Sequence, residues 1–174
     1  MRNYRLAIRL WLTVLLALQL NACGFHLRGA VELPEVMTRT HVVGGGGTDL
    51  YYELENALLN AGAEVVTSAE AATGTLTLHK QQVQRRVLSV DSQGRAAEYE
   101  LTLQLAFSLK DSAGRIIADN ERLSIVRDYS FDPDSVLGRE AEEQALRREM
   151  ERFAVSQMMR RLQSLARRPA PEKE

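Results

Sequence analysis

One stretch near the middle of the chain alternates apolar and polar residues over more than a dozen positions. Every odd position from 97 to 109 is apolar, and the even positions are polar except Ala106. A period of two is typical of a β-strand, because successive side chains point to opposite sides of the sheet. The pattern therefore predicts a sheet with one dry face that other elements must cover and one face open to water.

Other strands are expected around this one, together with a short strand beginning at 63–66. The long strands predicted from apolar patterning are residues 36–43, 75–90, 97–109 and 115–131. Turn residues at 91–94 and 111–114 join the last three as hairpins. The apolar positions of 75–90 change phase, which indicates a bulge or twist near 80–84.

Two helices with a single apolar stripe each are expected to cover the dry face. Residues 49–61 place Leu50, Leu54 and Leu58 on one side, and a longer helix spans 136–166. The stripe of the longer helix is Leu146, Met150, Phe153, Ala154, Met158, Leu162 and Leu165. We expect an α+β two-layer sandwich: a four-stranded, mixed but mostly antiparallel sheet, covered on one face by two helices.

The N-terminal segment has the pattern of a secretory signal. Three arginines precede an apolar run at 10–20, which is shorter than the ~20 residues that a membrane-spanning helix needs. The run ends in Leu20-Asn21-Ala22-Cys23-Gly24, which resembles the lipobox of bacterial lipoproteins. The resemblance implies that Cys23 is lipidated and that the chain is cut before it. An ordinary signal peptide that ends in a chance cysteine is the alternative.

Four parts of the chain follow from these patterns. They are a signal peptide at 1–22, a lipidated tether at 23–34, one α+β domain at 35–166 and a disordered tail at 167–174. Removal of the signal peptide leaves 152 of the 174 residues and moves the net charge from −1 to −4, because three arginines are lost. Nucleic acid is not an expected partner of an acidic chain, so any anion must bind to a local basic patch.

No constellation of residues predicts an enzyme, a metal site or a cofactor. His26, His41 and His79 do not form a helical i, i+4 pair of metal ligands. Glu98 and Glu100 share one side of a strand, an arrangement that a glycosidase could use for its two carboxylates. Every even position of that strand is hydrophilic except one, however, which favours a solvated face.

The four glycines at 44–47 invite comparison with a phosphate-binding loop. A P-loop continues with Gly-Lys-Ser/Thr, whereas Thr48-Asp49 follows here. An acidic residue in the first helical turn opposes a bound anion. We therefore interpret the glycines as a flexible loop.

Arginines on the wet face and at the strand ends are the candidate ligand-binding residues. They are Arg85, Arg86, Arg95 and Arg139. A guanidinium holds phosphate oxygens in a bidentate fork. Charges scattered only for solubility are the alternative.

Three motifs resemble the LptE family of lipopolysaccharide-assembly lipoproteins. They are Ala22-Cys23-Gly24-Phe25-His26-Leu27-Arg28, Gly94-Arg95-Ala96-Ala97-Glu98-Tyr99 and Tyr129-Ser130-Phe131-Asp132. The resemblance implies a lipid-anchored protein of the outer membrane that faces the periplasm and plugs the LptD β-barrel. It also implies that lipopolysaccharide is bound by basic residues near the hairpin and near the start of the last helix.

Arg95 and Arg139 lie near those two places, although the hairpin turn at 91–94 itself carries no basic residue. An outer-membrane scaffold lipoprotein without a lipid ligand remains the alternative.

Overall fold

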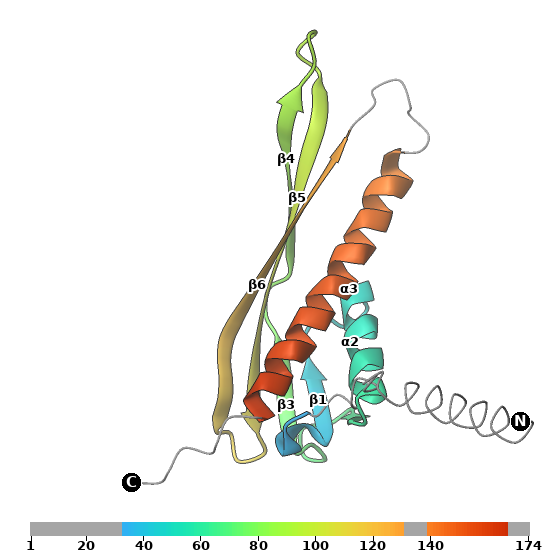
Figure 1. The fold of residues 1–174 in the computed structure, drawn as a ribbon. Coiled ribbons are helices and arrows are strands. Elements are labelled where there is room, and N and C mark those ends of the chain that lie inside the picture. The colour runs from blue at the N-terminus through green and yellow to red at the C-terminus, as the bar shows by residue number, and fades with distance from the viewer. Residues whose placement is uncertain (1–32, 131–138, 167–174) are drawn as a thin grey trace, which may run out of the picture. The chain divides into compact units, whose positions relative to one another are not determined.

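The computed structural model describes residues 33–130 and 139–166; the predicted signal peptide, Cys23, Phe131 and the predicted tail at 167–174 lie outside them. The elements are η1 (Glu35–Met37), β1 (Arg39–Val43), α2 (Asp49–Asn60), β2 (Glu64–Val66), β3 (Gly74–Leu78), β4 (Gln82–Val90), β5 (Ala96–Asp111), β6 (Ile116–Ser130) and α3 (Arg139–Ala166) (Figure 1). The expected α+β class is confirmed, but the described sheet has six strands and not four.

β5 is the central strand of the long antiparallel part of the sheet. β6 pairs with it over residues 98–110, while β3 and β4 pair with residues 107–111 and 96–104. Because β6 occupies one edge of β5, β3 and β4 must lie end to end along the other edge. On the far side of β3, β1 pairs in parallel with both β3 and β2. The mixed, mostly antiparallel topology is therefore as expected.

The predicted single strand at 75–90 is two strands, separated by residues 79–81. Leu78 lies opposite Phe107 and Val83 opposite Leu103, so β3 and β4 take five steps where β5 takes four. This one extra residue is the source of the phase change in the sequence. It ends a strand here and does not form a bulge inside one.

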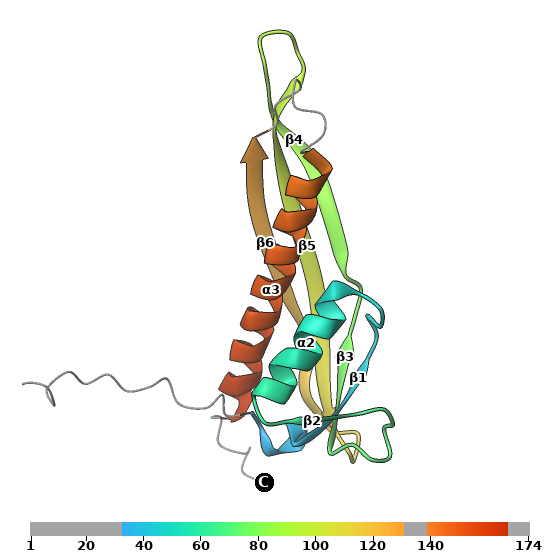
Figure 2. The ribbon, with the colours of Figure 1, turned by 90° about the vertical axis from the view of Figure 1, so that its right-hand side faces the viewer.

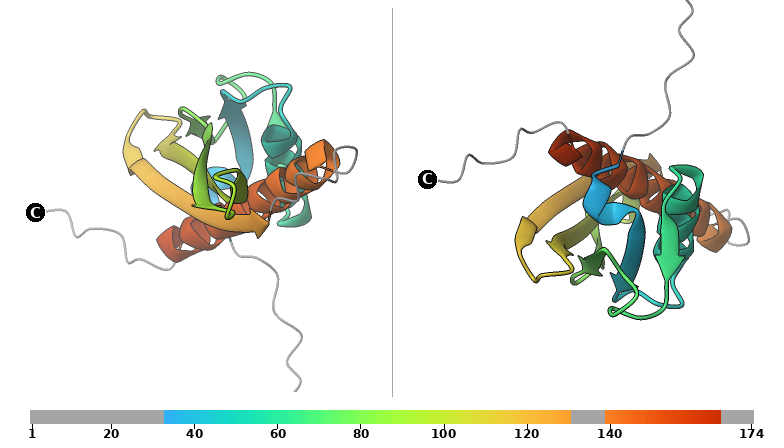
Figure 3. Two further views of the ribbon diagram at one scale, coloured as in Figure 1. Left: turned by 90° about the horizontal axis from the view of Figure 1, so that it is seen from above. Right: turned by 90° about the horizontal axis from the view of Figure 1, so that it is seen from below.

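Both helices lie on the same side of the sheet (Figures 2 and 3). The alternation of β5 is confirmed: its odd residues from Leu101 to Leu109 are at most 2% exposed. They pack in one core with Leu50, Leu54 and Leu58 of α2 and with the stripe of α3. The even side of β5 therefore forms the face opposite the helices, called the open face below.

The stripe of α3 differs from the prediction at one position. Phe153 is 39% exposed, and Val155 and Met159 are buried in its place. The Phe153 ring lies under two guanidinium groups, with Arg127 5.2 Å and Arg160 5.9 Å from its centroid. Cation–π contacts at the surface thus replace the expected core packing.

Neither described helix is both long and apolar enough to cross a membrane.

Candidate functional site

The predicted binding residues Arg85 and Arg86 are neighbours on β4 but face opposite sides of the sheet. Arg85 lies opposite Leu101 and Arg86 opposite Glu100 in the antiparallel register. Leu101 belongs to the core beneath the helices, so Arg85 points toward α3 and Arg86 toward the open face. Adjacency in the sequence therefore does not make these two arginines one cluster.

Arg85 joins the β4–β5 hairpin to α3. Its guanidinium donates a hydrogen bond to Glu143 at 3.0 Å and lies 4.9 Å from the centre of the Tyr99 ring. Glu143 also accepts hydrogen bonds from the Tyr129 hydroxyl at 2.7 Å and from Arg147. Burial raises the pKa of Glu143, but these hydrogen bonds outweigh it and hold that pKa below its ordinary value. Arg85 thus has a structural partner.

Arg86 forms a bidentate pair with Glu100 on the open face. Nε and Nη2 of the guanidinium donate to the two carboxylate oxygens at 2.6 and 2.8 Å. These hydrogen bonds lower the pKa of Glu100 despite its partial burial. The Arg86 side chain is 69% exposed, and water screens the attraction between an exposed guanidinium and its carboxylate. A stronger anion can therefore compete with Glu100 for Arg86.

Arg95 is bound within the hairpin turn. Its Nε donates to Asp91 at 2.8 Å, and the backbone N–H of Arg95 donates to the same carboxylate at 2.9 Å. The turn between β5 and β6 repeats this arrangement with Arg115 and Asp111. Because the same contacts occur in both turns, the Arg95–Asp91 pair stabilises the turn. The pair alone does not indicate a ligand-binding site.

Arg139 is the first residue of α3, and its side chain lies outside the described part. Among the described residues, Arg85 and Arg86 lie on opposite faces of the sheet and Arg95 lies in the hairpin turn. Each of the three is held by a carboxylate. Among the three described arginines, Arg85 therefore does not share a face with Arg86, and the grouping with Arg139 stays a prediction.

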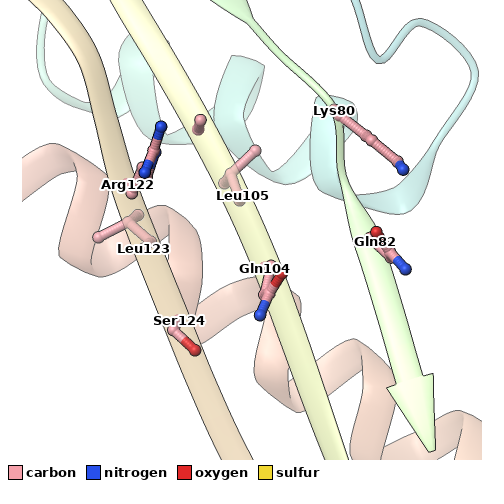
Figure 4. Close-up of a pocket in the computed structure, with 8 residues that line it drawn as sticks. Lys80, Gln82, Gln104, Leu105, Arg122, Leu123 and Ser124 are labelled. Atoms are coloured by element: carbon pink, nitrogen blue, oxygen red, sulfur yellow. The ribbon is translucent and has the colours of Figure 1, made fainter.

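A different basic site lies on the open face, where β4, β5 and β6 run side by side. A hollow of about 460 Å³ is lined there by five polar side chains and by the small Ala106. The polar residues are Lys80, Gln82, Gln104, Arg122 and Ser124. Figure 4 shows Arg122, Gln104 and Gln82 on three neighbouring strands, with Lys80 at the strand break. We call this site the open-face hollow.

The sequence contains a partial signal for this hollow. Ala106 is the single apolar residue among the even positions from 98 to 110, and Arg122 lies directly opposite it on β6. A small side chain beside a long one leaves space on a sheet face. Arg122 and Lys80 were not among the predicted binding residues. The position of Arg122 depends on the pairing register, and that of Lys80 depends on the strand break.

Metal binding has no support in the described residues, where no three His, Cys, Asp or Glu side chains gather in a way that could hold an ion.

Comparison with known proteins points to one family. The sequence model of a family described as "LptE: Lipopolysaccharide-assembly" matches residues 30–162. Proteins named LPS-assembly lipoprotein LptE from Photorhabdus laumondii and Pectobacterium atrosepticum are each 26% identical over 167 residues. The matches cover 93% of this chain and 87% and 86% of the two relatives.

Solved lipoprotein structures share the fold. The solution structure of an uncharacterized lipoprotein B from Nitrosomonas europaea matches with a TM-score of 0.68 at 29% identity, over 81% of this chain and 91% of that chain. The crystal structure of rare lipoprotein B from Shewanella oneidensis gives a TM-score of 0.64 at 23% identity, over 72% and 94%. The arrangement of sheet and helices is thus found in other lipoproteins.

Proposed function

We propose that this chain, which belongs to the LptE lipopolysaccharide-assembly family, is a lipid-anchored partner of the LptD β-barrel that assists insertion of lipopolysaccharide at the outer membrane. The observation that carries the proposal is the family match over residues 30–162, which spans the whole described domain except its last turn. The family is not known as a family of enzymes, and a structural and ligand-binding role agrees with the residues of the described domain.

The surface of β4 supports a large protein partner. Val87, Leu88 and Val90 are 51%, 44% and 59% exposed on this strand. β4 pairs only with β5 among the described strands, so its other edge is unpaired. Exposed apolar side chains next to a free strand edge are typical of an interaction surface. We propose that this end of the hairpin contacts the barrel.

Replacement of Leu88 and Val90 by glutamate should reduce the amount of LptD barrel that co-purifies with the chain by ~10-fold or more. Burial of a carboxylate in place of an apolar side chain removes the hydrophobic contribution and adds a desolvation cost. The measurement is pull-down of the barrel by the tagged full chain. Ile116→Glu is the control, because Ile116 is 54% exposed at the start of β6. Equal recovery with all three chains would refute this contact surface.

The outer-membrane anchor is proposed to be the lipid on Cys23. Cys23 is the only cysteine, and it follows a short apolar run in a lipobox pattern. Cys23→Ala should abolish labelling by radioactive fatty acid, delay signal cleavage and shift the protein out of the outer-membrane fraction. Unchanged labelling would mean that the lipid is attached elsewhere.

Lipopolysaccharide binding is proposed for the arginines Arg85, Arg86, Arg95 and Arg139. Arg86 and Arg95 are the members best suited to exchange their carboxylate partners for a phosphate, because the arginine side chains themselves are 69% and 48% exposed. Phosphate carries more charge than a carboxylate and takes the same fork of hydrogen bonds. Arg85 is less suited, since Glu143 and Tyr99 hold it against α3.

Arg86→Gln/Arg95→Gln should weaken lipopolysaccharide binding by ~10-fold or more at low salt, because two charge-assisted contacts are lost. Arg115→Gln is a matched control, since Arg115 makes the same turn contact at the other end of the sheet. Glu100→Gln should strengthen binding by releasing Arg86. The assay is titration of the full chain with fluorescent lipopolysaccharide in non-ionic detergent. Wild-type affinity in the double variant would contradict the proposal.

The scaffold function without a lipid ligand is the second candidate. The observation in its favour is that all three described members of the predicted set already have carboxylate partners. It predicts co-purification with the barrel and no saturable lipopolysaccharide binding by the wild-type chain, so the two experiments above separate the candidates.

A further inference from the structure

The open face has two halves of different chemistry. In the half toward the β4–β5 turn, polar side chains bond to one another: Arg86 and Thr102 donate to Glu100, and Ser89 donates to Glu98. In the half that contains the open-face hollow, none of the described residues forms a side-chain hydrogen bond with its five polar residues. The hydrogen-bonding groups of these five side chains are therefore available to a ligand.

Positive charge is also unbalanced in the hollow. Within the described ranges, Lys80 and Arg122 have no carboxylate at ion-pair distance, whereas Arg85, Arg86 and Arg95 each have one. None of the eight lining residues is acidic. The chain as a whole has 23 acidic and 22 basic residues. A hollow with two unpaired cations and no acidic residue is therefore more positively charged than the chain is on average. A concave surface with charge of one sign attracts an anion.

The hollow is larger than a single small anion, and its two cations lie too far apart to bind the same one. Arg122 lies on β6 and Lys80 beside the start of β4, two strand spacings apart, which corresponds to roughly 10 Å. Figure 4 shows Lys80 extending away from β5 on the side opposite Arg122. Between them lie the amides of Gln82 and Gln104, which can donate to and accept from hydroxyl groups. Amides between two cations suit a ligand with hydroxyls and negative charge.

We propose that the open-face hollow binds a sugar that carries a phosphate group. Arg122 binds the phosphate oxygens, and Gln82, Gln104 and Ser124 bind the sugar hydroxyls. Ala106 leaves the space that the sugar ring occupies, and Lys80 binds at the opposite rim. The biological source of the sugar rests on the proposed function, because a lipopolysaccharide-assembly protein meets the saccharide part of lipopolysaccharide. The site shares no residue with the predicted arginine set.

The test is an NMR titration of the isotope-labelled full chain in non-ionic detergent. Glucose 6-phosphate should shift the amide signals of Gln104, Ala106 and Ser124 and the Nε signal of Arg122. Glucose has the hydroxyls but no phosphate, and inorganic phosphate has no sugar ring. Each should therefore bind at least ~10-fold more weakly than glucose 6-phosphate. This factor is what one charge-assisted hydrogen bond typically contributes.

Two variants test separately whether binding depends on the charge of Arg122 and on the space beside Ala106. Arg122→Gln removes the phosphate contact, while Ala106→Leu fills the hollow and leaves every charge in place, so each should weaken binding ~10-fold or more. Arg152→Gln removes an exposed cation from α3 and should have no effect. Shifts centred elsewhere, equal losses in all three variants, or equal binding of phosphate and glucose 6-phosphate would overturn the proposal. If the barrel still co-purifies with Arg122→Gln, the proposed partnership stands independently of this site.

Discussion

Gly44→Ala should lower the free energy of unfolding by ~2–4 kcal/mol, although alanine is only one methyl group larger than glycine. Gly44 has φ of +86°, in the left-handed region that costs an L-residue ~1–2 kcal/mol. In addition, a Cβ there would lie 2.4 Å from the backbone oxygen of Leu78. The end of β1 and the end of β3 would have to move apart, so the strain adds to the conformational cost.

Gly46 provides the matched control two residues away. Its φ lies outside the left-handed range, and a Cβ there would meet no atom within 4 Å. Gly46→Ala should change the free energy of unfolding by less than ~1 kcal/mol, with a stabilising sign if the unfolded chain loses freedom. The measurement is urea unfolding of both variants followed by circular dichroism. Similar stabilities would show that Gly44 is not needed for the approach of the two strand ends.

This comparison also changes the interpretation of the glycine run. The sequence of residues 44–47 favours a flexible loop, because the residues after them do not suit a phosphate. In the structure, Gly44 is required at its position, because the chain turns after β1 in close contact with the backbone of Leu78 and leaves no space for a Cβ. A run of glycines in a sequence cannot by itself separate a required turn from a loose one.

The local patterns of the sequence predicted the fold class well. Alternation places alternate side chains on opposite faces regardless of neighbours, so the dry face of β5 followed from residues 97–109 alone. The strand count did not follow, because the phase change at 79–81 is compatible with either a bulge or a break. Only the pairing of both pieces with β5 distinguishes them. Phe153 fitted the helical period, yet two arginines from β6 and α3 hold it at the surface.

The candidate site was less predictable, since its chemistry depends on contacts across strands. Arginine type and position suggested anion binding, but whether an arginine is available depends on its carboxylate partner. Glu143 is 58 residues from Arg85 in the sequence and Glu100 is 14 from Arg86. The open-face hollow likewise requires the register that sets Arg122 opposite Ala106. Contacts between residues so far apart in the chain can hardly be predicted from a single sequence.

Leu103→Ala should lower the free energy of unfolding by ~2–5 kcal/mol, the range for deleting a buried leucine side chain. Leu103 is 1% exposed and lies between Val83 of β4 and Ile125 of β6 in the layer beneath the helices. Neighbours on both sides belong to hydrogen-bonded strands, so they cannot collapse into the cavity without breaking the ladder.

Two controls use the opposite face of the same sheet. Gln104 follows Leu103 in the chain but is exposed, and Val126 is an apolar residue with 46% exposure on the open face. Gln104→Ala and Val126→Ala should each cost less than ~1 kcal/mol, because neither leaves a cavity. Urea unfolding of the three variants gives the comparison. A cost for Val126→Ala equal to that for Leu103→Ala would mean that the open face is also buried, for example by self-association of the chain. A small cost for Leu103→Ala would instead show that the core beneath the helices is not tightly packed.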